Sequence, residues 1–251
     1  MCHKILAEVC CASLEDALCA QRCGADRIEL VSAHSLGGLT PSLGLLQLVK
    51  QQVDIPVMAI IRPRMSGFCY STEDYAVMCR DAELMLEAGA DGIVFGFLNS
   101  DGQIDERRVR HFVQMADQKE TVFHRAFDIC ANPMETAEQL CKMGVTRILT
   151  SGCKQNALEG ASMIANLQKA FNGRMQVLAG GGVRACNVKQ LIEQTAVTQV
   201  HFGGTGCLQD WSALRRPDMA FGAEKLPENA AYVAVKEDTV QAVIHALKTI
   251  K

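Results

Sequence analysis

The stretch from Thr121 to Asp128 combines the pattern of a buried strand with groups that are costly to bury. Its sequence, Thr-Val-Phe-His-Arg-Ala-Phe-Asp, has the length and the Val and Phe content of a β-strand. Side chains alternate along a strand, so His124 and Asp128 would share one face and Arg125 would lie on the other. At roughly 3.3 Å per residue, His124 and Asp128 would be about 13 Å apart, too far for a hydrogen-bonded dyad. Because unpaired buried polar groups are unfavourable, the stretch predicts either the floor and rim of a ligand site or a polar network that closes one end of a core.

Two glutamates and two more arginines lie in or beside other apolar runs. Glu8 and Glu29 each interrupt a short apolar segment, and Arg62 and Arg64 end a third one. The two arginines are two residues apart, so both would point to one face of a strand, where guanidinium groups suit bidentate binding of an anion. The structural alternatives are a buried ion-pair layer that joins the glutamates to Arg62 or Arg125, and a rim salt bridge for the arginines.

Two glycine runs end the last two expected strands. Gly180, Gly181 and Gly182 follow one apolar segment, and Gly203 and Gly204 follow the next. Glycine lets backbone N–H groups approach an anion closely. Loops of this kind hold phosphate in many barrels built from alternating strands and helices. The alternative is that these glycines only form tight turns.

The elements that must position these residues alternate regularly along the chain. Gly24 to Ile28 (Gly-Ala-Asp-Arg-Ile) recurs as 89–93 and as 144–148, where a glycine ends a helix and releases the chain into a strand. Thr40 and Pro41 have the types expected at the N-cap and first position of a helix. The expected strands span residues 5–11, 26–32, 56–64, 91–98, 121–128, 147–152, 176–182 and 199–204.

Eight strands, each followed by a helix, in 251 residues are typical of a (β/α)8 TIM barrel of the α/β class. We expect one domain over residues 1–251, with an irregular segment over 206–237 before the C-terminal helix. A doubly wound open sheet is the alternative, but no GxGxxG turn follows the first strand.

In such a barrel the working site lies at the mouth where the strands end. The polar residues above would meet there. Their chemistry divides them into candidate catalytic residues and candidate binding residues. The candidate catalytic residues are His124, Glu8, Glu29 and Asp128. The candidate anion- or substrate-binding residues are Arg62, Arg64, Arg125, Ser151, Gly180, Gly181, Gly182, Gly203 and Gly204.

Composition excludes several classes of partner. The net charge is −3 and no basic stripe is present, which argues against nucleic acid. No apolar run reaches the length of a membrane span, and Met1 to Lys4 lead directly into a short strand, so we expect neither a membrane segment nor a secretory signal. The twelve cysteines lack the regular spacing of a disulfide scaffold. They predict free thiols in a reducing, cytoplasmic environment.

Several long motifs resemble one protein family. They are Glu8-Val9-Cys10, 24–30, Gly-Gly-Leu-Thr-Pro-Ser at 37–42, Ile-Arg-Pro-Arg at 61–64, 123–128 and Leu-Thr-Ser-Gly at 149–152. These motifs resemble the CutC copper homeostasis proteins, over residues 6 to 205 or thereabouts. The resemblance implies a cytoplasmic TIM-barrel protein linked to copper handling, and a homo-oligomer, either a dimer or a tetramer.

The resemblance also implies a copper site. In animal members of the family two cysteines are proposed as copper ligands, one at the end of each of the first two strands. Cys10 matches the first position, whereas Val31 occupies the second. Cu(I) prefers two or three soft sulfur ligands, so Cys10 would need another thiol as partner. Candidates in or beside the loops of the same mouth are Cys11, Cys69, Cys130, Cys153 and Cys207.

Two functional hypotheses follow. The first is a cytosolic protein that binds or carries Cu(I), with Cys10 as the anchor ligand. The second is an enzyme for a small anionic or phosphorylated metabolite, in which Arg62, Arg64 and the glycine loops hold the anion while His124, Glu8 or Glu29 moves protons. A non-catalytic scaffold with a vestigial mouth is a third, weaker alternative.

Overall fold

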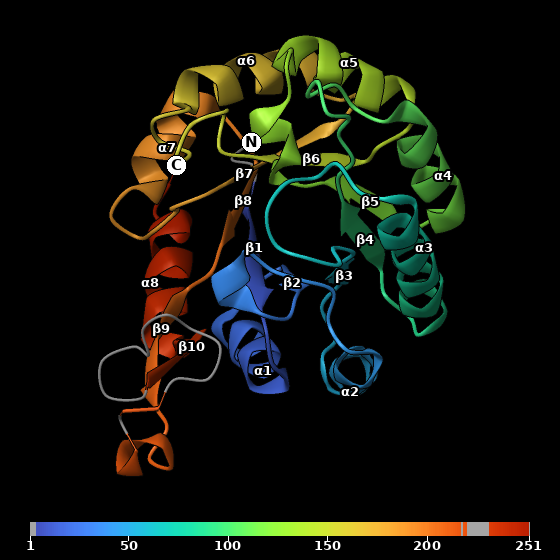
Figure 1. Ribbon diagram of the computed structural model, residues 1–251. Helices are drawn as coiled ribbons and strands as arrows, with labels where there is room; N and C mark the ends of the chain where they lie inside the picture. Colours follow the sequence, from blue (N-terminus) through green and yellow to red (C-terminus); the bar gives the residue numbers. More distant parts are fainter. Residues whose placement is uncertain (1–3, 217, 220–230, 251) are drawn as a thin grey trace.

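Apart from a few polar residues, the expected strand segments are apolar on both faces, as is typical of strands between a barrel interior and a shell of helices. In the computed structural model, which describes residues 4–216, 218–219 and 231–250, eight strands pair in parallel in the order β1 to β8, and β8 closes onto β1. Helices surround this ring (Figure 1). The predicted (β/α)8 barrel is confirmed, and the open sheet is excluded.

Each barrel strand is shorter than the segment that predicted it. The barrel strands are β1 Leu6–Cys11, β2 Arg27–Leu30, β3 Val57–Ile60, β4 Gly92–Phe95, β5 Glu120–Phe123, β6 Arg147–Thr150, β7 Gln176–Gly180 and β8 Gln199–Phe202. The helices are α1 Leu14–Cys23, α2 Leu43–Gln52, α3 Thr72–Glu87, α4 Glu106–Ala116, α5 Pro133–Lys142, α6 Ala161–Phe171, α7 Val188–Thr195 and α8 Glu237–Lys248. Short 3-10 helices are η1 His34–Leu36, η2 Arg125–Ile129 and η3 Ala213–Arg215.

Two local predictions are wrong. The stretch 121–128 is not one strand, because β5 ends at Phe123 and the chain turns into η2. His124 caps that turn, with its Nδ1 accepting the N–H of Ala126, so the strand alternation predicted for 124–128 does not hold. Helix α2 begins at Leu43 with Ser42 as its N-cap, not at Thr40, whose hydroxyl instead bonds to the backbone of Arg62.

Alternation along the strands sorts the core into two clusters. The outer cluster lies between the strands and the helices and contains Val9 and Cys11 of β1. The inner cluster fills the barrel and contains Cys10, Val31, Met58, Ile60, Val94, Val122, Leu149 and Leu178. Neighbouring residues of one strand therefore serve different environments, which places Cys10 inside the barrel and Cys11 outside it.

The segment expected to be irregular contains a two-stranded ribbon. Strand β9, Thr205–Gln209, pairs in antiparallel fashion with β10, Ala231–Val235. The ribbon lies beside α8, away from the ring of strands (Figure 1). A hydrogen bond from the N–H of Val235 to the carboxylate of Asp16 joins it to α1. Residues 217 and 220–230 of this segment, like the expected approach of 1–3 to the first strand, lie outside the described residues.

Two further expectations concern membranes and disulfides. No helix in the described part of the chain combines the length and the apolar character needed to cross a bilayer. The cysteines that the structure describes are all free thiols.

Candidate functional site

A polar network closes the N-terminal end of the barrel interior. We call it the polar floor and define it by Glu8 and five residues that begin strands. Glu8 forms a buried ion pair with Arg27. Arg27 also donates to Gln199 at 2.9 Å, and Gln199 donates to Gln176 at 2.7 Å. Arg147 completes the network by donating to Gln176 at 2.9 Å and to Glu120 at 2.8 Å.

The floor corrects one expectation about the glutamates. A buried ion pair is present, but the partner of Glu8 is Arg27 and neither Arg62 nor Arg125, and Glu29 lies beside His201 instead of an arginine. Strand pairing explains the difference, because Glu8 stands opposite Arg27 in the β1–β2 register.

From Glu8 of the floor, a polar chain continues through His201 of β8 and Glu29 of β2 to Cys10 of β1. Nδ1 of His201 lies 2.8 Å from Oε1 of Glu8, and its Nε2 lies 3.8 Å from Oε2 of Glu29. The thiol of Cys10 bonds to the carboxylate of Glu29. In the described part of the chain, Cys10, Glu29 and His201 are the one group of three potential metal ligands, with donor atoms within 4.8 Å of one another.

Burial and neighbouring charges shift the pKa values of this chain. Burial alone would raise the pKa of Glu8, but the hydrogen bond from His201 and the charge of Arg27 lower it to about 2. Burial, with the charge of Glu8, raises the pKa of Glu29 despite His201. For His201, the two carboxylates outweigh burial and raise its pKa. Burial and Glu29 raise the pKa of Cys10 well above the ordinary thiol value, so the metal-free group is a protonated thiol.

A cavity of about 930 Å³ opens above this chain, at the C-terminal mouth of the barrel; we call it the mouth cavity. Its lining includes these residues predicted from the sequence: Cys10, Glu29, Arg62, His124, Arg125, Gly181, Gly182, Gly203 and Gly204. Five other predicted residues do not line it: Glu8, Arg64, Asp128, Ser151 and Gly180.

Arg62 and His124 carry buried donors without partners. The guanidinium of Arg62 donates through its terminal nitrogens to the carbonyls of Leu36, Gly38 and Ser66, but its Nε has no partner. Nδ1 of His124 accepts a backbone N–H, so the proton of the neutral ring is on Nε2, which also has no partner.

Packing fixes both of these side chains. Phe68, on the loop between β3 and α3, lies against both groups, with its ring centroid 5.4 Å from Cζ of Arg62 and 4.8 Å from the His124 ring centroid. Gly96 leaves the space for the imidazole, because a Cβ at that position would collide with the ring. Burial, aided by the charge of Arg62, lowers the pKa of His124 to about 3. The ring is therefore neutral at physiological pH.

Arg64 does not join Arg62 in the cavity. Strand β3 ends at Ile60, and Arg64 begins a bend over residues 64–66 beyond the strand. Nε of Arg64 pairs with Asp74 of α3 at 2.9 Å, and the guanidinium stacks over Tyr70. The expected arginine pair on one strand face is therefore not formed.

Asp128 and Ser151 support Arg125 from outside the cavity. Asp128 accepts from Arg125 Nε at 2.7 Å and from Ser151 Oγ at 2.8 Å. It also accepts from Thr150 and from the N–H of Cys153. With its acceptors occupied in this way, Asp128 holds η2 and the β6 loop together and directs Arg125 to the rim.

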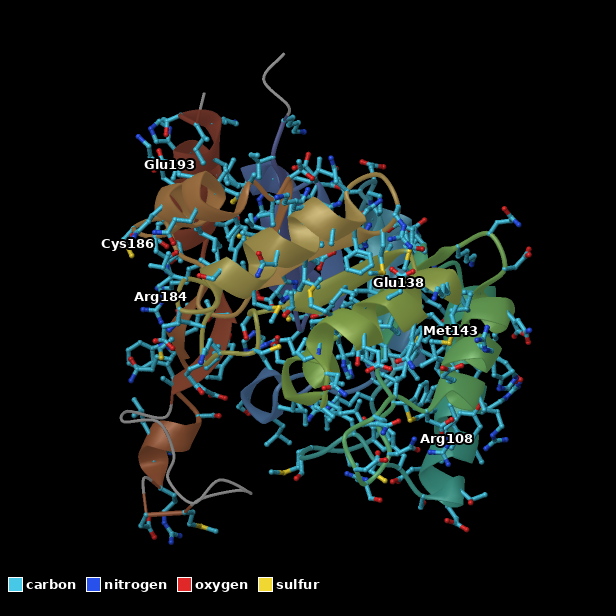
Figure 2. All side chains as sticks on the ribbon, turned by 90° about the horizontal axis from the view of Figure 1, so that it is seen from above. Arg108, Glu138, Met143, Arg184, Cys186 and Glu193 are labelled. Atoms are coloured by element: carbon cyan, nitrogen blue, oxygen red, sulfur yellow. The ribbon has the colours of Figure 1, made fainter. Side chains whose placement is uncertain are left out.

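The cavity has further lining residues that sequence reasoning did not select. His34 of η1 lies near Gly203, where a Cβ would be 3.4 Å from His34 Nε2. Its place in the loop after the second strand was the available signal. Figure 2 shows Arg184 and Cys186 at the outer edge of the loop leading to α7, where both are exposed. Asp238 of α8 completes this side of the rim.

The other thiols that the structure describes do not supply a second sulfur beside Cys10. Cys11 faces the helices, and Cys186 is at the exposed rim outside the three-ligand group. The remaining candidates, Cys69, Cys130, Cys153 and Cys207, do not line the mouth cavity. Since Cu(I) prefers two or three soft ligands, the described residues offer it one thiol with an imidazole and a carboxylate.

The fold and the cavity define a (β/α)8-barrel protein whose polar groups converge at the C-terminal mouth. The chain belongs to the CutC family, whose model matches residues 5–206. The family resemblance of its motifs is thereby confirmed.

Relatives agree with this assignment. The chain is 42% identical to a CutC family protein of Treponema denticola, over 97% of this chain and 99% of the relative. It is 43% identical to the human copper homeostasis protein cutC homolog, over 88% of this chain and 81% of the relative. The crystal structure of CutC from Streptococcus agalactiae matches with a TM-score of 0.75 at 31% identity, covering 78% of this chain and 97% of that one.

Proposed function

We propose that the mouth cavity binds a small organic anion and that the protein is an enzyme acting on it. The observation that carries this proposal is the pair of buried, unpartnered donors, Arg62 Nε and His124 Nε2. Leaving a buried donor without a partner costs roughly 1–3 kcal/mol. A ligand that accepts hydrogen bonds from both donors would remove that cost.

Charge supports the same assignment. Arg62 is buried and, among the described residues, its guanidinium bonds to backbone carbonyls and to no carboxylate. A buried cation without an ionic partner favours an anion from outside the protein. Arg125 and Arg184 add positive charge elsewhere in the lining.

The glycine loops are the second place for an anionic group. Gly181, Gly182, Gly203 and Gly204 line the cavity, as expected for a phosphate cradle. The first turn of the adjacent helix α8, however, is acidic, with Glu237 and Asp238. Because acidic side chains oppose an anion at a helix N-terminus, we assign the anionic group to Arg62 and His124.

The groups that would move protons lie across the cavity. In a ring of eight strands β5 is opposite β1, so His124 faces the side that carries Cys10, Glu29 and His201. The pKa values of Glu29 and His201 are both raised, which suits general acid–base work near neutral pH. His124, with its pKa of about 3, would act as a neutral hydrogen-bond donor, while Glu8 would orient His201.

The test is a titration of the protein with inorganic phosphate, malonate and glycerol 3-phosphate, followed by the 15N resonance of His124 Nε2–H. We expect at least one anion to shift this resonance saturably, and Arg62→Gln to weaken that binding at least tenfold. Arg64→Gln, the same change two residues away and outside the cavity, is the matched control. Equal effects of both substitutions, or no shift with any probe, would refute the proposal.

A second candidate function is Cu(I) binding through Cys10. The observation that favours it is the Cys10 thiol within reach of His201, in a family whose human member is named for copper homeostasis. A thiolate and an imidazole would give two-coordinate copper. Anaerobic Cu(I) titration against a competing chelator tests this: Cys10→Ser should abolish tight binding, and retained affinity would remove Cys10 from the role.

The expected cytoplasmic location and homo-oligomeric state remain proposals. Free thiols throughout the described residues support a reducing compartment. The exposed apolar side chains of the ribbon, Tyr232 and Val233, with Trp211 just after β9, support an oligomer contact.

A further inference from the structure

Three strands that are neighbours in the ring bring three different ligand types to one point. Cys10 comes from β1, Glu29 from β2 and His201 from β8. The β1–β2 register places Glu29 directly beside Cys10, and the β1–β8 register places His201 beside Glu8. The positions of these side chains are therefore set by backbone ladders of the barrel, with donor atoms within 4.8 Å of one another.

A second observation points to a metal ion. Nδ1 of His201 lies 2.8 Å from Glu8, whose carboxylate is held in turn by Arg27. A carboxylate can only accept, so Nδ1 carries the proton and the lone pair of the neutral ring is on Nε2, the atom that faces Glu29. Histidines that bind metals are oriented by a carboxylate in this manner.

We propose that Cys10, Glu29 and His201 bind one divalent cation of the zinc class, with Glu8 as a positioning residue. A thiolate, an imidazole and a carboxylate together form a borderline donor set, which suits Zn²⁺ better than Cu(I). Ligand atoms around tetrahedral zinc are about 3.5 Å apart, so the group must contract slightly, and the thiol proton that now bonds to Glu29 is released to solvent.

The site has the form of a catalytic rather than a structural zinc centre. All three ligands line the mouth cavity, so a molecule in the cavity could reach the ion at a remaining coordination position. Structural zinc sites, in contrast, are closed by four protein ligands. Arg62 and His124 follow other strands, β3 and β5, so they could hold an anion whether or not a metal is bound. With a metal bound, Glu29 and His201 would be its ligands and would not move protons.

The experiment is a titration of metal-stripped, reduced protein with Zn²⁺ and Co²⁺. We expect one ion per chain, with Co²⁺ giving the intense visible bands of four-coordinate cobalt and a thiolate-to-cobalt charge-transfer band. Glu29→Gln should weaken Zn²⁺ binding at least 100-fold, and Glu8→Gln about 10- to 100-fold with the charge-transfer band retained. Cys11→Ala, which removes the adjacent thiol on the outer face of β1, should change neither quantity.

The outcomes are separable. Absence of the charge-transfer band, unchanged Zn²⁺ affinity in Glu29→Gln, or tight Cu(I) binding by a protein that does not bind Zn²⁺ would each overturn the inference. Circular dichroism identifies any variant that fails to fold, and Cys10→Ser then provides an independent removal of the thiolate. Arg62→Gln should retain the cobalt spectrum, so a failure of the anion proposal is recognised separately.

Discussion

The polar floor and the pair Arg62–His124 are buried to similar degrees but differ in how their polar atoms are satisfied. Glu8 is 2% exposed and Arg147 0%, against 7% for Arg62 and 4% for His124. In the floor, carboxylates and amides meet the arginines, and Nη1 of Arg147 is the unpartnered atom. At the mouth, by contrast, a cation without a carboxylate lies next to a neutral imidazole with a free N–H.

This difference distinguishes buried polar groups that stabilise the fold from buried polar groups that are available to a ligand. A buried charge that is paired and hydrogen-bonded is explained by folding alone. A buried donor without a partner beside a cavity is not explained by the folded chain itself, and it favours the uptake of an acceptor by the cavity. Both regions are buried, so the presence of a buried charge does not by itself mark a site.

The largest effect is expected from breaking the floor. Arg27→Met leaves the Glu8 carboxylate buried without its cation, and we expect a loss of about 3–5 kcal/mol in the free energy of unfolding at pH 7. Chemical denaturation followed by circular dichroism measures it.

The double variant Glu8→Gln/Arg27→Met is the matched control, because it removes both charges. It should be distinctly more stable than Arg27→Met alone. Equal stabilities would show that Arg27 does not compensate the buried charge of Glu8. The floor would then not be the paired structure described above.

A smaller effect is expected at the mouth, from the glycine that makes room for the imidazole. Gly96→Ala places a methyl group into the His124 ring, which must move, and we expect a loss of about 3 kcal/mol with a shift of the Nε2–H resonance. Gly44→Ala in α2, where a Cβ meets open space, should instead be neutral or stabilising by up to about 1 kcal/mol. An unshifted His124 resonance in Gly96→Ala would contradict the packing described for this wall.

Much of this barrel was predictable because the residues that end its helices and begin its strands are recognisable locally in the sequence. The glycines that end helices, as at Gly24 and Gly144, and the apolar runs between them predict eight strands without any long-range information. The ends of the strands were predicted less well. His124 ends β5 because its side chain caps η2. Such a side-chain bond to the backbone competes with strand formation, and the Val- and Phe-rich sequence around it predicts only the strand.

The site itself could be predicted only in part, for a physical reason. Strand ends meet at the mouth in any barrel, so Cys10, Glu29 and His124 were correctly expected there. Which groups pair depends on register and ring closure: Glu8 and His201 are 193 residues apart and meet because β8 closes on β1. One signal was overlooked, since Arg27 shares the face of Glu29 in a four-residue strand.

The smallest expected effect concerns the pH dependence of the free energy of unfolding. Burial lowers the pKa of His124 to about 3, whereas in the unfolded chain it returns to about 6.5, so the unfolded state binds this proton first as the pH falls. Stability that is complete above pH 6.5 is therefore lost progressively toward pH 3. Between pH 7 and pH 5 the expected loss from this residue is about 2 kcal/mol.

His124→Gln should remove that loss, so the measurement is the difference between the two proteins in the pH dependence of the unfolding free energy. Glu8, with its pKa of about 2, adds acid sensitivity only below about pH 4.5, and the raised pKa of His201 affects wild type and variant alike. His245→Gln, at an exposed histidine of α8, serves as the control and should follow wild type. If the unfolding free energies of wild type and His124→Gln changed with pH in parallel, the imidazole would be solvated or already hydrogen-bonded. The contrast between the paired groups of the floor and the unpartnered donors of the mouth would then be wrong for His124.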